Sequence, residues 1–261
     1  MIRAKKSLGQ NFLIDRNILE KIVLITEIKD KTILEVGPGT GNLTSFILKN
    51  NPKKMYAVEK DKDLSANLIE NYKNQLTLIN DDILNIDENL ISSEKLIVFG
   101  NLPYNISTEI LSRWILNLKD NFWFEHLILM FQKEVANRII ADFNTSTYGR
   151  LSILANWKLD IEKICDIKPE AFSPKPKIDS SLLFFTPKKK YFEINNPKNL
   201  EKITRVFFSH RRKMLKKPFN QIFNDNKKIL DKLKIDLNLR PQNLNFETYY
   251  KLAYEYENLI S

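Results

Sequence analysis

The chain has 261 residues, of which 43% are hydrophobic and 28% are charged, as is usual for a globular protein with a buried core. Its single cysteine excludes an internal disulfide, and its basic N-terminus lacks the apolar segment of a signal peptide. No run approaches the roughly 18 apolar residues of a membrane span. We therefore expect a soluble, cytoplasmic protein without membrane contact.

The net charge of +9 is concentrated toward the C-terminus. Residues 187–261 hold 17 of the 41 Lys and Arg residues but only 8 of the 32 Asp and Glu residues, so the rest of the chain is balanced. This asymmetry favours a polyanionic partner such as nucleic acid, and the alternative is a basic surface that is only solvated.

Short apolar runs alternate with amphipathic segments between residues 32 and 186, which is typical of βα units around a parallel sheet. Apolar residues three and four positions apart predict helices over 42–50, 63–72 and 107–118. The predicted strands are 32–36, 55–58, 76–79, 96–99, 127–131, 159–167 and 180–187. The last two flank a proline-rich turn, and we expect them to pair antiparallel and complete a seven-stranded α/β sheet.

The strand pattern stops after Pro187. Residues 197–261 are predicted to be helical, with breaks near Pro218 and Pro241. We therefore predict two domains: a larger α/β domain over 1–190 that begins with a basic arm over 1–12, and a smaller helical domain over 191–261.

Three glycines follow the first of these strands, at Gly37, Gly39 and Gly41, immediately before a helix. Glycines let the chain turn sharply and let a ligand approach the backbone, while the helix start offers free N–H groups. Dinucleotide-binding loops space their glycines G-x-G-x-x-G, whereas here the third comes one residue early. The tighter spacing suits a nucleoside without phosphates, such as S-adenosylmethionine, and the alternative is an ordinary strand-to-helix turn.

Acidic residues follow the next two strands. Glu59 lies 22 residues after Gly37, close to the offset at which an acidic side chain meets ribose hydroxyls. Asp82 follows the third strand, where it can accept a hydrogen bond from an adenine amino group while Ile83 lies against the ring. The glycine loop and the two acids together favour a nucleoside cofactor more than any one of them alone.

The fourth strand ends in the sequence Asn101, Leu102, Pro103, Tyr104. An adenine N6 amino group is a poor nucleophile because its lone pair is delocalised into the ring. The Asn101 side-chain oxygen and a backbone carbonyl can bind the two N6 hydrogens and aim the lone pair at a methyl group, and Tyr104 can stack on the base. Catalysis would then rest on positioning and electrostatics. Cys165 is remote from the strand ends, which argues against covalent methylation of a pyrimidine, and the two isolated histidines suggest no metal site.

These motifs resemble those of the ribosomal small-subunit RNA adenine N6,N6-dimethyltransferases, with the macrolide-resistance ribosomal methyltransferases as close relatives. The resemblance covers nearly the whole chain and rests on ordered matches that include KKSLGQNFL, ILEVGPGTGNLT, VEKD, NDDIL, FGNLPYNIST, AFSPKPKIDSSL and FFSHRRKML. It implies a class I, Rossmann-like methyltransferase sheet. The cofactor contacts that it implies are Asn11, Leu13, Gly37, Glu59, Asp82 and Asn101. It also implies that residues 101–104 form the catalytic loop and that Phe172 is a second aromatic that sandwiches a flipped adenine.

The resemblance further implies a substrate of two adjacent adenosines in a hairpin near the 3′ end of small-subunit rRNA, within a pre-ribosomal small subunit, each receiving two methyl groups. We expect the enzyme to act as a monomer. The alternatives are a large-subunit rRNA methyltransferase of the macrolide-resistance type, a DNA adenine methyltransferase and a non-catalytic RNA-binding assembly factor. The intact glycine loop, Glu59 and residues 101–104 argue against loss of catalysis.

Residues 205–217 contain six Lys and Arg residues and no acid. If this segment were one helix, Ile203, Phe207, His210 and Met214 would face inward and Arg205, Arg212 and Lys216 would share the opposite face. We predict that these three cations contact RNA, the alternative being a solvated helix face.

Overall fold

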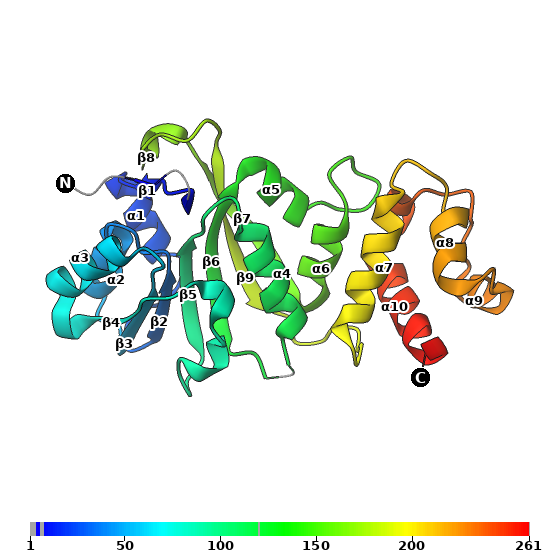
Figure 1. The fold of residues 1–261 in the computed structure, drawn as a ribbon, viewed down its shortest axis with the longest axis horizontal. Coiled ribbons are helices and arrows are strands. Elements are labelled where there is room, and N and C mark those ends of the chain that lie inside the picture. The colour runs from blue at the N-terminus through cyan, green and yellow to red at the C-terminus, as the bar shows by residue number, and fades with distance from the viewer. Residues whose placement is uncertain (1–3, 6–7, 120, 261) are drawn as a thin grey trace. The chain divides into compact units, whose positions relative to one another are not determined.

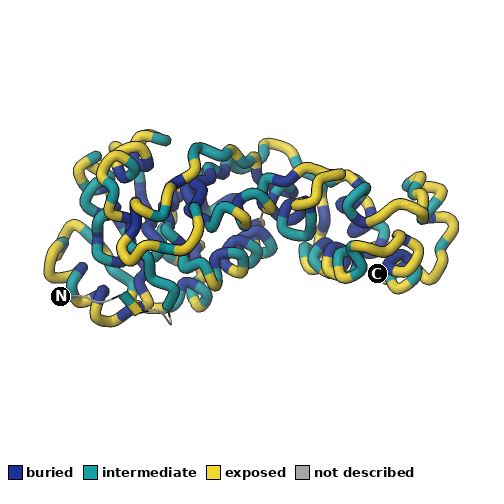
Figure 2. The backbone as a smooth tube through the Cα atoms, turned by 90° about the horizontal axis from the view of Figure 1, so that it is seen from above, coloured by how far each residue is buried: buried dark blue, intermediate teal, exposed yellow. Residues whose placement is uncertain are grey.

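The computed structural model describes residues 4–5, 8–119 and 121–260, and the chain divides into two units (Figure 1). Unit 1 comprises Met1–Ile110, Leu118–Ala136 and Glu162–Pro187. Unit 2 comprises Leu111–Asn117, Asn137–Ile161 and Lys188–Ser261. Buried, intermediate and exposed residues alternate along the chain in both units (Figure 2).

Unit 1 is built on a seven-stranded sheet with the order β4-β3-β2-β5-β6-β9-β7. These strands are β2 (Thr32–Val36), β3 (Lys54–Val58), β4 (Thr77–Ile79), β5 (Leu96–Asn101), β6 (Phe124–Gln132), β7 (Leu159–Ile167) and β9 (Ser180–Pro187). The five strands from β4 to β6 are parallel, and β9 pairs antiparallel with β6. The predicted seven-stranded α/β sheet is confirmed. Every residue of β2 is buried, as expected of a parallel strand that is covered on both faces.

The helices between the strands are α2 (Asn42–Lys49), α3 (Lys62–Tyr72) and α4 (Ser107–Asn117), close to the predicted ranges. Helices α1 (Arg16–Val23) and α5 (Lys133–Ile139) are short and were not predicted from the sequence. The side chain of Asp15 caps α1 by accepting the main-chain N–H groups of Asn17 and Ile18. Helix α1 packs against α2.

The register of the parallel strands places the chemistry-bearing loops side by side. Val36 of β2 is opposite Val58 of β3 and Gly100 of β5, and Val58 is opposite Ile79 of β4. The residues that follow these strands therefore leave the sheet at one common edge. In an open parallel sheet, ligands bind at this carboxyl edge.

A two-stranded sheet ties the N-terminal arm to unit 1. In it, β1 (Phe12–Leu13) pairs antiparallel with β8 (Phe172–Ser173). Residues 1–3 and 6–7 of the predicted arm lie outside the described residues. The described part of the arm is held along the edge of the sheet where the loops meet.

Unit 2 is helical. It includes Leu111–Asn117 of α4, and its other helices are α6 (Arg150–Lys158), α7 (Pro197–Ser209), α8 (Lys216–Phe223), α9 (Lys227–Leu233) and α10 (Phe246–Ile260). Helix α7 packs against α6, α8 and α10. The predicted break at Pro241 is confirmed, since Pro241–Asn243 forms a 3₁₀ turn between α9 and α10. No helix among the described residues of either unit is long and apolar enough to cross a membrane.

The prediction that residues 205–217 form one helix is wrong. Helix α7 ends at Ser209 and α8 begins at Lys216, so Arg205, Arg212 and Lys216 do not lie on a common helix face. Met214, predicted to face inward, is 58% exposed. The physical reason is Pro218, which lacks an N–H group and is tolerated in the first turn of a helix but not in its interior.

The prediction that four residues of this segment face inward is partly correct. Ile203 and Phe207 are buried, and His210 is half-buried. The turn that replaces the helix buries Leu215 completely, and the main-chain N–H of Leu215 donates to the carbonyl of Leu239 at 2.8 Å. Leu215 therefore takes the inward place that the helical pattern gave to Met214.

A buried carboxylate joins the last helix of unit 2 to the start of α7. Glu257 on α10 accepts the main-chain N–H of Asn196, the N-cap of α7, at 2.7 Å and that of Asn195 at 3.1 Å. It also accepts a hydrogen bond from the Asn199 side chain. A carboxylate at a helix start satisfies free N–H groups and complements the helix dipole.

We predict that Glu257→Gln lowers the free energy of unfolding by about 1.5–3 kcal/mol, because it removes hydrogen bonds to a charged group and turns an amide NH₂ toward backbone donors. Urea denaturation measures the loss. The matched control is Glu247→Gln on the same helix, which removes an exposed ion pair with Lys251 and should change stability by less than about 0.5 kcal/mol. Equal effects of the two substitutions would contradict the capping role.

Candidate active site

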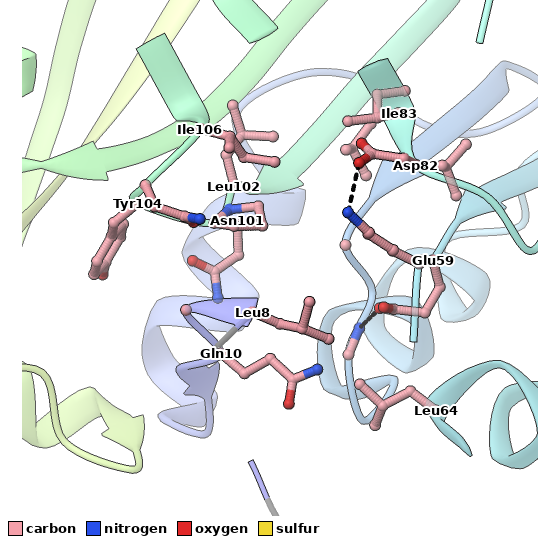
Figure 3. A pocket seen from close by; sticks show the side chains of 18 of the residues that line it. Leu8, Gln10, Glu59, Leu64, Asp82, Ile83, Asn101, Leu102, Tyr104 and Ile106 are labelled. Carbon is pink, nitrogen blue, oxygen red and sulfur yellow. Dashed lines mark hydrogen bonds and ion pairs between the residues drawn. The ribbon is translucent and has the colours of Figure 1, made fainter. Parts of the chain in front are cut away.

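A pocket opens at the carboxyl edge of the sheet in unit 1. Figure 3 shows Asn101 and Tyr104 on one side of it and Glu59 and Asp82 on the other, with Leu8 and Gln10 between them. The space enclosed by its walls is about 930 Å³ when the open solvent at its mouth is included. Its lining comprises Leu8, Gly9, Gln10, Asn11, Phe12, Val36, Gly37, Gly39, Val58, Glu59, Lys60, Leu64, Asp81, Asp82, Ile83 and residues 101–106.

The glycine loop needs its glycines for two reasons. Gly37 and Gly39 have φ angles of +70° and +58°, which favour glycine. In addition, a Cβ atom on Gly39 would lie 2.7 Å from the ring of Phe12. The arm can therefore lie directly on the loop, and together they form one wall of the pocket.

The Glu59 side chain is hydrogen-bonded to the glycine loop. Its Oε2 accepts the main-chain N–H of Gly39 at 3.1 Å, and its Oε1 accepts that of Asp61 at 2.8 Å. Burial raises the pKa of Glu59, and the two N–H donors oppose that rise. A carboxylate can accept about four hydrogen bonds, so capacity remains for the hydroxyls of a ribose.

Asp82 is held in place by its neighbours. Its Oδ1 accepts the N–H of Leu84 and caps the 3₁₀ turn Ile83–Asn85, while its Oδ2 pairs with Lys60 Nζ at 2.7 Å (Figure 3). Ile83 is buried beside it and lines the pocket. This pair presents a polar edge and an apolar surface, as a planar base requires.

The side-chain orientation of Asn101 is set by the arm. Its Nδ2 donates to the main-chain carbonyl of Asn11 at 2.7 Å. Because the amide nitrogen is committed in this way, Oδ1 is the atom that remains to accept a hydrogen from a ligand. Leu102 is 1% exposed and anchors the turn that follows, while Pro103 and Tyr104 line the pocket.

The structure brings most of the predicted site residues into this pocket. They are Asn11, Gly37, Glu59, Asp82, Asn101, Leu102, Pro103 and Tyr104. Leu13 and Phe172 do not line it: they are opposite one another in the β1–β8 sheet and are buried, at 4% and 3% exposure. Leu13 lines a smaller neighbouring cavity, and its carbonyl accepts a hydrogen bond from Asn42. The stacking role of Phe172 stays a prediction.

Sequence reasoning missed part of the pocket wall and its support. Leu8, Gly9, Gln10 and Phe12 line the pocket although their segment has no helical or strand periodicity that could place it there. Among the described residues, no group of three or more His, Cys, Asp or Glu could hold a metal ion. Arg205, Arg212 and Lys216 are exposed in unit 2 and take no part in this pocket.

A second buried carboxyl, Glu35 of β2, lies under the glycine loop. It is 2% exposed, and Thr44 Oγ1 donates to its Oε2 at 2.6 Å. It lines the small cavity that also contacts Gly37 and Asn101. Burial raises the pKa of Glu35 to about 8, the Thr44 hydrogen bond opposes this, and the charge of Glu59 adds to it.

Comparison with known proteins shows likeness along the whole chain. The family model described as "Ribosomal RNA adenine dimethylase" matches residues 1–258. The chain is 66% identical over 258 residues to "Ribosomal RNA small subunit methyltransferase A" of Pelagibacter ubique (strain HTCC1062), covering 99% of this chain and 98% of the relative. It is 42% identical to the protein of the same name from Ehrlichia ruminantium (strain Gardel), covering 97% of each.

Two solved structures share the fold. A dimethyladenosine transferase from Plasmodium falciparum superposes with a TM-score of 0.79 at 26% identity, covering 95% of this chain and 98% of the other. The 23S rRNA methyltransferase ErmE superposes with a TM-score of 0.68 at 21% identity, covering 95% and 100%. The second likeness concerns the fold alone.

We predict that Glu35→Gln flattens the dependence of stability on pH. In the unfolded chain a glutamate ionises near pH 4.3, whereas folded Glu35 keeps its proton up to about pH 8. Between these values the folded state binds more protons, so rising pH destabilises the unchanged protein relative to the variant. The difference should grow by about 1 kcal/mol per pH unit between roughly pH 5 and 8. Denaturant unfolding of both proteins over this range measures it, and parallel curves would contradict the raised pKa.

Proposed function

The chain belongs to the ribosomal RNA adenine dimethylase family, as its motifs predict, and we propose that it dimethylates N6 of two adjacent adenosines near the 3′ end of small-subunit rRNA. The observation that carries the proposal is the 66% identity, over nearly the full length of both chains, with a protein named ribosomal RNA small subunit methyltransferase A. The enzyme is an S-adenosylmethionine-dependent methyltransferase. The large-subunit alternative is not favoured, because the likeness to ErmE is one of fold.

The pocket fits a nucleoside cofactor. When bound, S-adenosylmethionine supplies a methyl group activated by a sulfonium. We propose that Glu59 binds the ribose hydroxyls of the cofactor and that Asp82 and Ile83 contact its adenine. The main chain at Gly37 and Asn11 contacts the rest of the cofactor. Support comes from the unused acceptor capacity of Glu59 and from the polar edge beside an apolar surface at Asp82 and Ile83. Leu13 acts behind this wall, through its carbonyl bond to Asn42.

The target base enters the same pocket from the side of residues 101–104. Asn101 Oδ1 accepts one N6 hydrogen and a main-chain carbonyl of the turn accepts the other, which draws the nitrogen lone pair out of conjugation with the ring. Tyr104 stacks on the base, and Phe172 is proposed for its other face. Neither acid nor base is needed before the methyl group is transferred, so the residues act by position and by preorganised dipoles.

The rRNA substrate requires binding outside the pocket. We propose that residues 191–261 form an RNA-binding domain, appended to a methyltransferase domain over 1–190, and that Arg205, Arg212 and Lys216 contact phosphates. Their exposure and the charge surplus of the C-terminal residues support this. We also propose that the enzyme is a monomer, that it acts in the cytoplasm, and that its substrate is a pre-ribosomal small subunit.

The function is tested by incubating small-subunit rRNA, in assembling subunits, with the protein and S-adenosylmethionine. Mass analysis of the RNA should find N6,N6-dimethyladenosine at two adjacent positions. Large-subunit rRNA and DNA serve as the alternative substrates, and methylation of either in preference to small-subunit rRNA would overturn the proposal. RNA binding without any methyl transfer would identify an assembly factor instead.

We predict that Asn101→Ala slows methyl transfer by about 10²–10³-fold, because it removes one preorganised acceptor from the transition state. Cofactor affinity is measured separately by calorimetry, since Asn101 also lines the cofactor pocket. A variant that binds cofactor normally and methylates at the original rate would refute the catalytic role.

We predict that replacing Arg212 and Lys216 together with Gln weakens RNA binding and reduces the log–log salt slope by about 1.5 units, as expected for two lost phosphate contacts. Salt titrations of RNA binding give the slope. The matched control replaces Lys232 and Lys251, whose charges are paired with Glu255 and Glu247. If the Arg212 and Lys216 variant gives the same slope as the unchanged protein, these residues form a solvated surface.

A further inference from the structure

The hydroxyl group of Tyr104 is engaged by the sheet rather than left in the pocket. Tyr104 Oη and Ser180 Oγ are 2.6 Å apart, and Ser180, the first residue of β9, is completely buried. Tyr104 itself lines the pocket. The ring is therefore fixed at both of its ends.

Ser180 is itself rigidly placed. It is opposite Gln132 in the pairing of β9 with β6. The residue before it, Asp179, accepts the main-chain N–H of Lys133 at 2.9 Å through its carbonyl, and its carboxylate pairs with Lys168 at 3.0 Å. The main chain that carries the Ser180 hydroxyl is therefore fixed, so the hydroxyl offers the Tyr104 ring a fixed point of attachment.

Stacking on a base does not by itself require this hydroxyl. A phenyl ring and a phenol ring present similar faces to a purine. The hydroxyl instead restricts rotation of the tyrosine side chain. A freely rotating ring would have to be ordered when the base arrives, whereas an anchored ring is already in place.

We propose that Ser180 is a positioning residue for base binding, which orients the Tyr104 ring through the bond between the two hydroxyls. This inference rests on the proposed function and adds to it a residue outside the pocket lining. Ser180 does not line the pocket. It acts through Tyr104, so its loss should affect use of the RNA and leave cofactor affinity unchanged.

The expected loss of activity in Ser180→Ala follows from the free-energy cost of ordering one side chain when the base binds. Immobilising a side chain on binding corresponds to a loss of about three- to tenfold in affinity. Ser180→Ala should therefore lower kcat/KM for the RNA by about three- to tenfold, with the dissociation constant of S-adenosylmethionine changed less than about twofold. A merely structural role would weaken both, since Tyr104 lines the pocket that holds both ligands.

The test is a double-mutant cycle of Ser180→Ala and Tyr104→Phe, with methylation of small-subunit rRNA as readout. Each single variant should show the same loss, and the double variant should lose no more than either. Additive losses would overturn the proposal, as would a Ser180→Ala variant as active as the unchanged protein. If Ser180→Ala does not fold, Tyr104→Phe removes the same bond from the other side, and full activity of that variant would equally refute the idea.

The matched control is Ser181→Ala. Ser181 is also completely buried in β9, but its side chain points to the opposite face of the sheet, and it donates to Asp166 Oδ1 at 2.6 Å. The Ser181→Ala variant should keep the kcat/KM of the unchanged protein. A loss equal to that of Ser180→Ala would show that the effect comes from removing a buried serine of β9 and not from the bond to Tyr104. Failure of the proposed function is distinguishable, because the unchanged protein would then methylate no small-subunit rRNA.

Discussion

The site depends on the parallel pairing of β2 with β3 on one side and β5 on the other. This pairing sets Val36, Val58 and Gly100 in one row, so the glycine loop, Glu59 and Asn101 leave the sheet together. A change of register by one residue would send each of these side chains to the opposite face, because side chains alternate along a strand. Such a shift would also displace the side chains that are packed on both faces of β2 and β5.

The residues at this edge are held before any ligand arrives. The arm orients Asn101 through the carbonyl of Asn11, and two main-chain N–H groups hold Glu59. Methylation of an exocyclic amine without prior deprotonation gains little from acids or bases, so it depends on where the acceptors and the ring are placed. On the proposed mechanism, residues 101–104 therefore depend on the arm and on β9, which hold Asn101 and Tyr104 in place.

In the proposed function, the two units carry different parts of the chemistry. Unit 1 contains the pocket and its buried carboxyl groups. The excess of Lys and Arg lies in the last segment of unit 2, Lys188–Ser261. Phosphate contacts give affinity and register without reading bases, and a folded pocket provides the chemical selectivity. Such a division lets an exposed basic surface tolerate an irregular backbone, as the turn between α7 and α8 illustrates.

The sequence alone determined the seven strands and the residues that end them, because buried parallel strands read as unbroken apolar runs and their loops carry the polar residues. It also determined the family, through motifs in a fixed order. Only the tertiary structure decided that Leu8, Gly9, Gln10 and Phe12 line the pocket beside Asn11, that Phe172 is buried and does not line it, and that Ser180 meets Tyr104. These contacts join segments far apart in the chain, and no local periodicity records them. The continuous helix over 205–217 failed for a related reason: its apolar spacing was compatible with a helix, but burial of Leu215 and the position of Pro218 favoured a turn.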